Sequence, residues 1–102
     1  MKMNEKIKRY LGLAKNAGKA VSGEFSTDRA VKRGKAFLVI VAEDASDATK
    51  KEFTDMCTYY HVPCIIHGIK DELGKSVGCE YRACVAVCDE GLAKAITKSL
   101  DS

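Results

Sequence analysis

Seven consecutive apolar residues run from Ala36 to Ala42, between Gly34 and the acidic pair Glu43-Asp44. The run is short and rich in β-branched and aromatic residues, which favours a strand over a helix. No polar residue alternates within it, and such a pattern is typical of a strand covered on both faces. We therefore predict that Ala36–Ala42 forms the central strand of a sheet, with helices above and below it.

The rest of the chain alternates between segments with helical spacing of apolar residues and short apolar runs. Glycine follows several of the helical segments, as it commonly does where a helix ends, and Pro63 follows another. We predict helices at about Asn4–Ala17, Gly23–Arg33, Ser46–Tyr60 and Lys70–Val77, a last helix after Asp89, and strands at Ala20–Ser22, Cys64–Ile66 and Ala83–Cys88.

Helices that alternate with strands predict a largely parallel sheet with helices on both faces. The fold class is therefore α/β, and we expect a three-layer α/β/α sandwich of four strands over residues 1–102. A chain of 102 residues accommodates one domain with one modest core.

Residues that favour helix starts precede the second and third predicted helices. Ser22 or Gly23 is expected to cap the second helix, and Asp44 or Ser46 the third. The third helix is predicted to bury a stripe made of Thr49, Phe53, Met56, Cys57 and Tyr60.

The composition is that of a folded protein, since 46% of the residues are hydrophobic, 30% are charged and one is proline. The first residues, Met1 to Lys6, contain no apolar segment of the kind found in signal peptides, and no apolar run approaches the length of a membrane span. We expect a cytoplasmic protein.

The five cysteines include no Cys-x-x-Cys pair and no accompanying histidine pair, so we expect reduced thiols and no metal or cofactor.

The sequence contains no arrangement typical of a catalytic site. Glu43 and Asp44 are neighbouring carboxylates, but adjacent residues of a strand point to opposite faces, which favours a helix cap and a solvated acid. His61 and His67 flank a predicted strand and are interpreted as loop or edge residues, and no glycine-rich phosphate loop follows a strand. We predict that the protein is not an enzyme.

Three segments are expected to meet at one end of the sheet, namely the start of the Gly23 helix, the Glu43–Ser46 turn and the Cys79–Arg82 loop. They offer backbone donors together with the side chains of Ser26, Arg29, Arg33, Lys70, Tyr81 and Arg82. Donors, guanidinium groups and a stacking ring are typical of surfaces that bind irregular RNA. An ordinary polar rim has the same composition, and the net charge of +3 does not decide between the two interpretations.

Five segments share their order and spacing with one protein family, and the similarity extends over almost the whole chain. The segments are Leu11–Glu24 (LGLAKNAGKAVSGE), Ala30–Gly34 (AVKRG), Val41–Ala45 (VAEDA), Tyr60–Pro63 (YHVP) and Leu73–Gly78 (LGKSVG). Through them the chain resembles the L7Ae/L30e family of kink-turn RNA-binding ribosomal proteins, particularly its small bacterial YlxQ-type branch. The resemblance implies an α/β/α sandwich around a mixed four-stranded sheet. It also implies binding to kink-turns, which are sharp RNA bends built on tandem sheared G·A pairs beside a bulge.

The binding motif of that family, Gly-x-Asn-Glu-x-x-Lys at the start of the second helix, falls here on Gly23, Phe25, Ser26 and Arg29. Gly23 matches, and Arg29 keeps the positive charge of the lysine. Phe25 cannot make the hydrogen bonds of the family Asn, and Ser26 reaches only part of the distance that a Glu spans. The loss of such contacts to the G·A edges should cost about 1–3 kcal/mol for each base-reading pair.

The resemblance implies further contacts to RNA. Arg33 and Lys70 match basic residues that meet the RNA backbone, and Cys79-Glu80-Tyr81 matches a loop that packs on a flipped-out base. Tyr81 stacked on such a base would contribute about 1–3 kcal/mol. Ser46 lies where some members place an acid near the same nucleotide. The predicted RNA-binding residues are therefore Gly23, Phe25, Ser26, Arg29, Arg33, Ser46, Lys70, Cys79, Glu80, Tyr81 and Arg82.

Two hypotheses about function follow. In the first, the protein is a ribosome-associated, non-enzymatic RNA-binding protein that holds kinked or bulged structured RNA in one geometry. In the second, the same surface is a protein-interaction module of the translation machinery, with Phe25 and Tyr81 exposed as apolar anchors.

Overall fold

Four short strands form one sheet whose spatial order differs from their order along the chain. The computed structural model describes residues 3–100. The strands follow one another across the sheet in the order β1-β4-β2-β3. Their bounds are β1 (Ala20–Ser22), β2 (Leu38–Val41), β3 (Cys64–Ile66) and β4 (Cys84–Val87).

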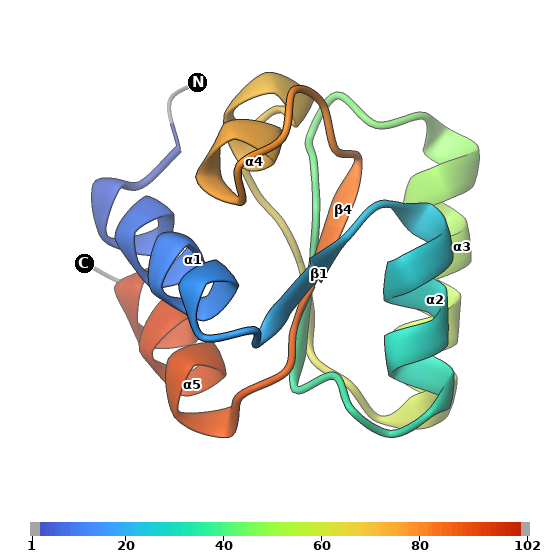
Figure 1. Cartoon of the computed structure of the whole chain (residues 1–102). Coiled ribbons are helices and arrows are strands. Elements are labelled where there is room, and N and C mark those ends of the chain that lie inside the picture. The colour runs from blue at the N-terminus through green and yellow to red at the C-terminus, as the bar shows by residue number, and fades with distance from the viewer. Residues whose placement is uncertain (1–2, 101–102) are drawn as a thin grey trace.

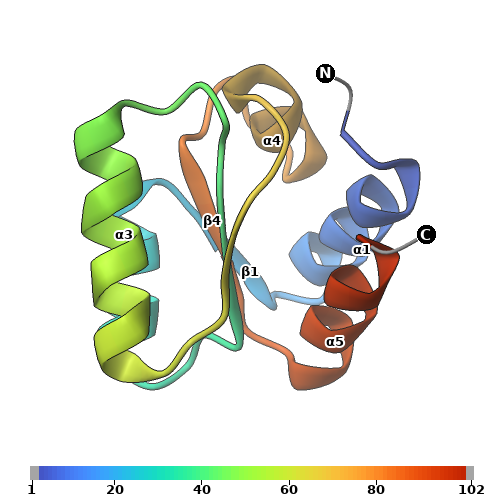
Figure 2. The ribbon, with the colours of Figure 1, turned by 180° about the vertical axis from the view of Figure 1, so that it is seen from behind.

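Five helices cover the two faces of this sheet. Figures 1 and 2 show α1, α4 and α5 on one face and α2 and α3 on the other. The helices are α1 (Glu5–Asn16), α2 (Glu24–Lys32), α3 (Asp47–Tyr60), α4 (Lys70–Ser76) and α5 (Glu90–Ser99). The predicted three-layer α/β/α arrangement is therefore confirmed.

The sheet is mixed, which confirms the sheet implied by the family resemblance, whereas the largely parallel sheet expected from the alternation of helices and strands is wrong. Only β2 and β3 are parallel, whereas β4 runs antiparallel to both of its neighbours, β1 and β2. The connection that contains α4 brings the chain to β4 at the end of the sheet where β3 stops, since Cys84 lies opposite Val41 and Val41 lies opposite Ile66. β4 therefore begins where β3 ends and runs the other way.

The predicted central strand lies in the interior of the sheet. All four residues of β2 are buried, as are all four of β4 beside it. Phe37 is 41% exposed because it precedes the strand proper, so the doubly covered segment is shorter than the apolar run.

In α3, Phe53 and Cys57 are buried as predicted, but Tyr60 is 39% exposed because it lies in the last turn, beyond the edge of the sheet.

The structure shows which of the two candidate residues caps each of the helices α2 and α3. Gly23, rather than Ser22, is the N-cap residue of α2, and no side chain caps that helix. Ser46, rather than Asp44, caps α3, because its Oγ accepts a hydrogen bond from the Thr49 amide at 3.1 Å.

Within residues 3–100, no helix is long and apolar enough to span a membrane.

Glu72 of α4 anchors the segment that leads into α1. Its carboxylate accepts a hydrogen bond from the Met3 amide at 3.0 Å and forms a salt bridge with the Lys8 ammonium group at 3.1 Å. The hydrogen bond from Lys8, followed by that from Met3, holds the pKa of Glu72 below its usual 4.5. A carboxyl group with a depressed pKa stabilises the folded state above its unfolded pKa and loses that contribution as the pH falls through its folded pKa.

We expect Glu72→Gln to flatten the acid limb of the stability curve, because the substituted side chain no longer titrates. Denaturant unfolding of wild type and variant between about pH 6 and pH 2 measures this difference. Glu52→Gln is the matched control, since Glu52 is exposed on α3 and forms no salt bridge among the described residues. Parallel curves for wild type and Glu72→Gln would contradict the assignment.

Candidate nucleic-acid interface

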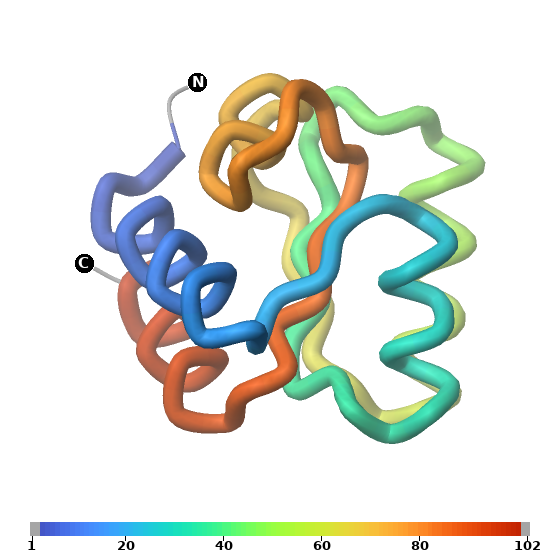
Figure 3. Tube along the Cα trace, viewed as in Figure 1, coloured from blue at the N-terminus to red at the C-terminus, as the bar shows by residue number. Residues whose placement is uncertain are grey.

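The N-terminal end of α2 and the loop that precedes β4 line a common hollow of about 340 Å³. Figure 3 shows the two segments passing side by side at the α4 end of the sheet. The hollow is lined by Ser22, Gly23, Glu24, Phe25, Ser26, Tyr81, Arg82 and Ala83. We call this the rim hollow.

Hydrogen bonds across the sheet hold the two sides of the rim hollow together. The Gly23 amide donates to the Cys84 carbonyl at 2.9 Å, which continues the β1–β4 ladder past the end of β1. Arg82 Nε donates to Ser22 Oγ at 3.0 Å, and one of its terminal nitrogens donates to the Tyr81 carbonyl at 2.7 Å. The guanidinium group is therefore fixed between the two segments.

The backbone at Gly23 adopts a conformation that favours glycine. Its φ is 90°, a conformation that glycine adopts readily and L side chains rarely adopt. A Cβ at this position would also approach Cδ and Nε of Arg82 to 3.9 Å. No side chain caps α2, and the residues of its first turn, Glu24, Phe25 and Ser26, line the hollow, so an uncapped helix start borders it.

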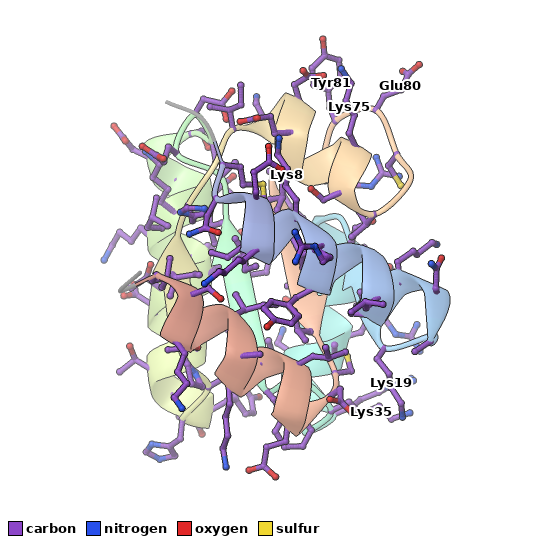
Figure 4. All side chains as sticks on the ribbon, turned by 90° about the vertical axis from the view of Figure 1, so that its left-hand side faces the viewer. Lys8, Lys19, Lys35, Lys75, Glu80 and Tyr81 are labelled. Atoms are coloured by element: carbon purple, nitrogen blue, oxygen red, sulfur yellow. The ribbon has the colours of Figure 1, made fainter. Side chains whose placement is uncertain are left out.

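Two aromatic rings stand on opposite sides of the rim hollow. Phe25 of α2 is 73% exposed and Tyr81 of the loop is 64% exposed. Figure 4 shows Tyr81 projecting from the α4 end of the molecule, together with Glu80. The Arg29 guanidinium carbon lies 5.3 Å from the centre of the Phe25 ring, which is cation–π distance.

The third predicted segment, the Glu43–Ser46 turn, joins the rim only indirectly. The Asp44 carboxylate accepts a hydrogen bond from the Lys70 amide at 2.8 Å, and the Lys70 carbonyl accepts one from the Arg82 amide at 3.2 Å. Ser46 lines neither the rim hollow nor the adjoining one along α2, because its hydroxyl is engaged in capping α3. The structure thus brings the turn close but keeps Ser46 apart.

The remaining predicted residues do not line the rim hollow and lie at different distances from it. Cys79 is half-buried, and its Sγ lies 3.9 Å from Ser22 Oγ. Glu80 is exposed and lines a neighbouring surface depression together with Tyr81. Arg33 lies at the far end of α2, where it lines a second hollow with Arg29.

The cations of this surface carry no partner acid. Among the described residues, Arg29, Arg33 and Arg82 form no salt bridge, whereas Lys32 on another side of α2 pairs with Asp28 at 3.2 Å. An unpaired guanidinium group keeps all of its free donors for phosphate or base edges. The rim therefore offers donors, positive charge and two stacking faces in one place.

The thiols of Cys84 and Cys88 have raised pKa values, and the described residues contain no metal-binding cluster. Burial raises the pKa of Cys84 to about 11 and also raises that of Cys88, so both thiols are protonated at neutral pH. No group of three or more His, Cys, Asp or Glu side chains in the described part of the chain is placed to hold a metal ion. These thiols act as small apolar side chains.

Gly74 of α4 was not among the predicted site residues, although the loop carrying Tyr81 rests directly on it. A Cβ at Gly74 would lie 2.6 Å from the Glu80 carbonyl oxygen and 2.9 Å from the Tyr81 amide nitrogen. Ser22 and Asp44 were also missed, because their roles consist of contacts to Arg82 and Lys70 that are distant in the sequence. A glycine in mid-helix, within the Leu73–Gly78 segment, was the one local signal for Gly74.

The fold and this surface define a class, a small three-layer α/β domain with two exposed aromatic rings and the Arg82 guanidinium group at one end of its sheet. Residues 5–97 match the Ribosomal protein L7Ae/L30e/S12e/Gadd45 family. The chain belongs to this family, which is non-catalytic.

Individual relatives agree with this membership. The chain is 44% identical to "RNA-binding protein YlxQ" of Bacillus subtilis, over 89% of this chain and 91% of that protein. It is 34% identical to "Large ribosomal subunit protein eL30" of Yarrowia lipolytica, over 97% of this chain and 93% of that protein. A solved structure of a Bacillus halodurans protein of unknown function superposes with a TM-score of 0.90 at 31% identity, covering 97% of this chain and 99% of the other.

We expect Gly74→Ala to lower the free energy of unfolding by about 1–3 kcal/mol, because the methyl group meets backbone atoms that cannot rotate away. Amide resonances of residues 79–82 should shift as the loop is displaced. Gly12→Ala is the matched control, since a Cβ at Gly12 of α1 meets nothing within 4 Å. That control should gain about 0.5–1 kcal/mol from helix propensity, and equal effects of the two substitutions would refute the close contact.

Proposed function

We propose that this chain is a cytoplasmic, ribosome-associated RNA-binding protein that holds kinked or bulged structured RNA without catalysing a reaction. The observation that carries the proposal is the rim hollow, where two exposed rings and an uncapped helix start meet the Arg82 guanidinium group, with Arg29 packed against the Phe25 ring beside it. The printed names of the Bacillus subtilis and Yarrowia lipolytica relatives, an RNA-binding and a ribosomal protein, support the same class of ligand.

Tyr81 is suited to hold a base that has left the helical stack. Its ring is 64% exposed, while its carbonyl is tied to Arg82, so the side chain is presented on an anchored backbone. Stacking of a base on an aromatic ring is worth about 1–3 kcal/mol and tolerates any base. Tyr81 therefore favours a flipped-out nucleotide rather than a particular sequence.

Phosphate contacts should supply most of the affinity and the register of the complex. Arg29, Arg33 and Lys70 are the cations proposed to meet the RNA backbone. About half to two-thirds of hydrogen bonds in nucleic-acid complexes go to phosphates and sugars. Binding should accordingly weaken steeply as salt is added, because counterions are released.

Base reading at the kink is expected to be weaker than in relatives that carry Asn and Glu in the binding motif. Phe25 presents a ring with no hydrogen-bonding atom, and it is 73% exposed rather than folded onto the core. Ser26 presents one short hydroxyl group. The proposed ligand is therefore a bent or bulged RNA in which the sheared G·A pairs contribute less than the unpaired base.

A second candidate function, binding of a protein from the translation machinery, is favoured by the exposure of Phe25 and Tyr81. Aromatic anchors of this kind are common at the centres of protein interfaces. The unpaired arginines beside them favour RNA, because the centre of a protein interface is usually depleted of charge. Binding that survives nuclease treatment of the partner fraction would support the protein-binding alternative.

Arg29→Ala should weaken binding to a kink-turn oligonucleotide and make the salt dependence of log K shallower by about 1, because one phosphate contact is removed. Gel-shift titrations at several salt concentrations measure both effects. Lys98→Ala is the control, since Lys98 lies on α5 and lines neither the rim hollow nor the hollow along α2. Equal losses for the two variants would count against the site.

The double substitution Phe25→Asn with Ser26→Glu should increase discrimination between a kink-turn and a mutant lacking its G·A pairs. Each restored base-reading pair adds about 1–3 kcal/mol to that discrimination, by analogy with bidentate readout. Titration of both RNAs with wild type and double variant provides the measurement. The hypothesis fails if wild type already discriminates as strongly as the double variant.

A further inference from the structure

A second hollow runs along α2 and shares one wall with the rim hollow. Its volume is about 320 Å³, and Phe25 and Ser26 belong to the lining of both hollows. The lining of this second hollow, which we call the α2 hollow, comprises Val21, Phe25, Ser26, Arg29, Ala30, Arg33, Lys35 and Cys88. An elongated ligand seated in the rim hollow can therefore continue into the α2 hollow by crossing Phe25.

The side chains of the α2 hollow carry positive charge and no negative charge. Three of its lining residues, Arg29, Arg33 and Lys35, are cations, and none is an acid. In the described part of the chain none of these three forms a salt bridge. The floor, by contrast, is apolar, since Val21, Ala30 and Cys88 supply it.

Lys19 is a further cation that forms no salt bridge within residues 3–100, and it lies near the end of α2 that is far from Tyr81. The Lys19 carbonyl accepts the Cys88 amide at 2.7 Å, which fixes this residue beside the hollow. Burial raises the pKa of Cys88, and the Lys19 and Lys35 charges both oppose that rise, so both ammonium groups lie within electrostatic range of the same thiol. Figure 4 shows Lys19 and Lys35 together at one end of the molecule and Tyr81 at the other.

We propose that the α2 hollow, with Lys19 and Lys35 at its far end, binds the phosphate backbone of the RNA stem that flanks the unpaired nucleotide. This inference rests on the proposed function, since it extends the same RNA from the rim hollow along α2. It assigns Lys19 and Lys35 to recognition of the stem, whereas Tyr81 and Arg82 hold the irregular nucleotide.

The length of α2 sets the length of stem that this contact requires. Nine residues of helix span about 13 Å, which equals the rise of about five base pairs of A-form RNA at about 2.8 Å each. A stem shorter than this ends before it reaches Lys19 and Lys35. Affinity should therefore increase as the stem is lengthened to about five base pairs and then level off.

Fluorescence anisotropy with a bulged hairpin series tests this arrangement. Each RNA carries the same three-nucleotide bulge, and the stem on one side and then on the other is varied between about two and about ten base pairs, with the short stem closed by a stable tetraloop. Wild-type protein should bind the long-stem RNA more tightly than the short-stem RNA for one of the two sides. Lys19→Ala combined with Lys35→Ala should remove most of that difference and make the salt dependence of log K for the long RNA shallower by about 2.

The matched control is Lys6→Ala combined with Lys98→Ala. This pair removes the same charge from a different hollow, between α1 and α5, and neither residue forms a salt bridge among residues 3–100. The control should keep the stem-length effect. Thermal unfolding of both double variants checks that the fold is intact.

Alkylation of Cys88 gives a readout that does not depend on affinity. The long-stem RNA, at saturating concentration, should slow the reaction of Cys88 with iodoacetamide several-fold, whereas the short-stem RNA should protect it less. Cys64, which is half-buried in β3 away from this surface, should react at the same rate with either RNA. Peptide mass spectrometry distinguishes the two cysteines.

The outcomes separate this inference from the proposed function. If wild type binds the short-stem RNA and Tyr81→Ala weakens that binding, yet stem length, the lysine pair and Cys88 protection have no effect, the stem contact alone is refuted. If wild type binds neither RNA at low salt, the proposed function is refuted and the stem contact with it. A stem-length effect that the Lys19 and Lys35 substitutions abolish and the Lys6 and Lys98 substitutions preserve supports the assignment.

Discussion

The antiparallel pairing of β1 with β4 is the interaction on which the candidate site depends. The ladder continues past Ser22 in the bond from the Gly23 amide to the Cys84 carbonyl, at 2.9 Å. Because β4 starts at the end of the sheet where β1 stops, the tip of α2 and the Tyr81 loop are held beside each other. Each segment alone is an ordinary helix start or turn, and the hollow exists only between them.

The orientation of α2 determines which of its charges remain available. Thr27, Ala30 and Val31 are buried, so the rotation of the helix about its axis is fixed by the core. On the exposed surface, Lys32 is neutralised by Asp28 while Arg29 and Arg33 have no partner among the described residues. Exposed ion pairs add little to stability, so leaving the two arginines unpaired costs the fold little. Stability thus comes from one side of α2, and the potential for binding from the other.

Local pattern predicted the elements of this fold well and their arrangement less well. The buried run at β2 follows from the sequence alone, and the sequence narrows each of the caps of α2 and α3 to two candidates, because these features depend on propensity or periodicity within a few residues. The direction of β4 cannot be predicted from local pattern, since parallel and antiparallel buried strands have the same apolar pattern. Tyr60 has helical spacing with Phe53 but lies 39% exposed, because the sheet ends before the helix does.

By itself, the sequence determined the succession of helices and strands, the family resemblance and most side chains of the rim, since these depend on residue type and spacing. Only the tertiary structure decided that Arg82 is held by Ser22, that Asp44 bonds the Lys70 amide and that Gly74 leaves room for the Tyr81 loop. It also separated Ser46 from the rim and connected the rim to Lys35 along α2. The physical reason is that these contacts join residues far apart in the chain, and a contact of that kind leaves no mark on the local pattern of either partner.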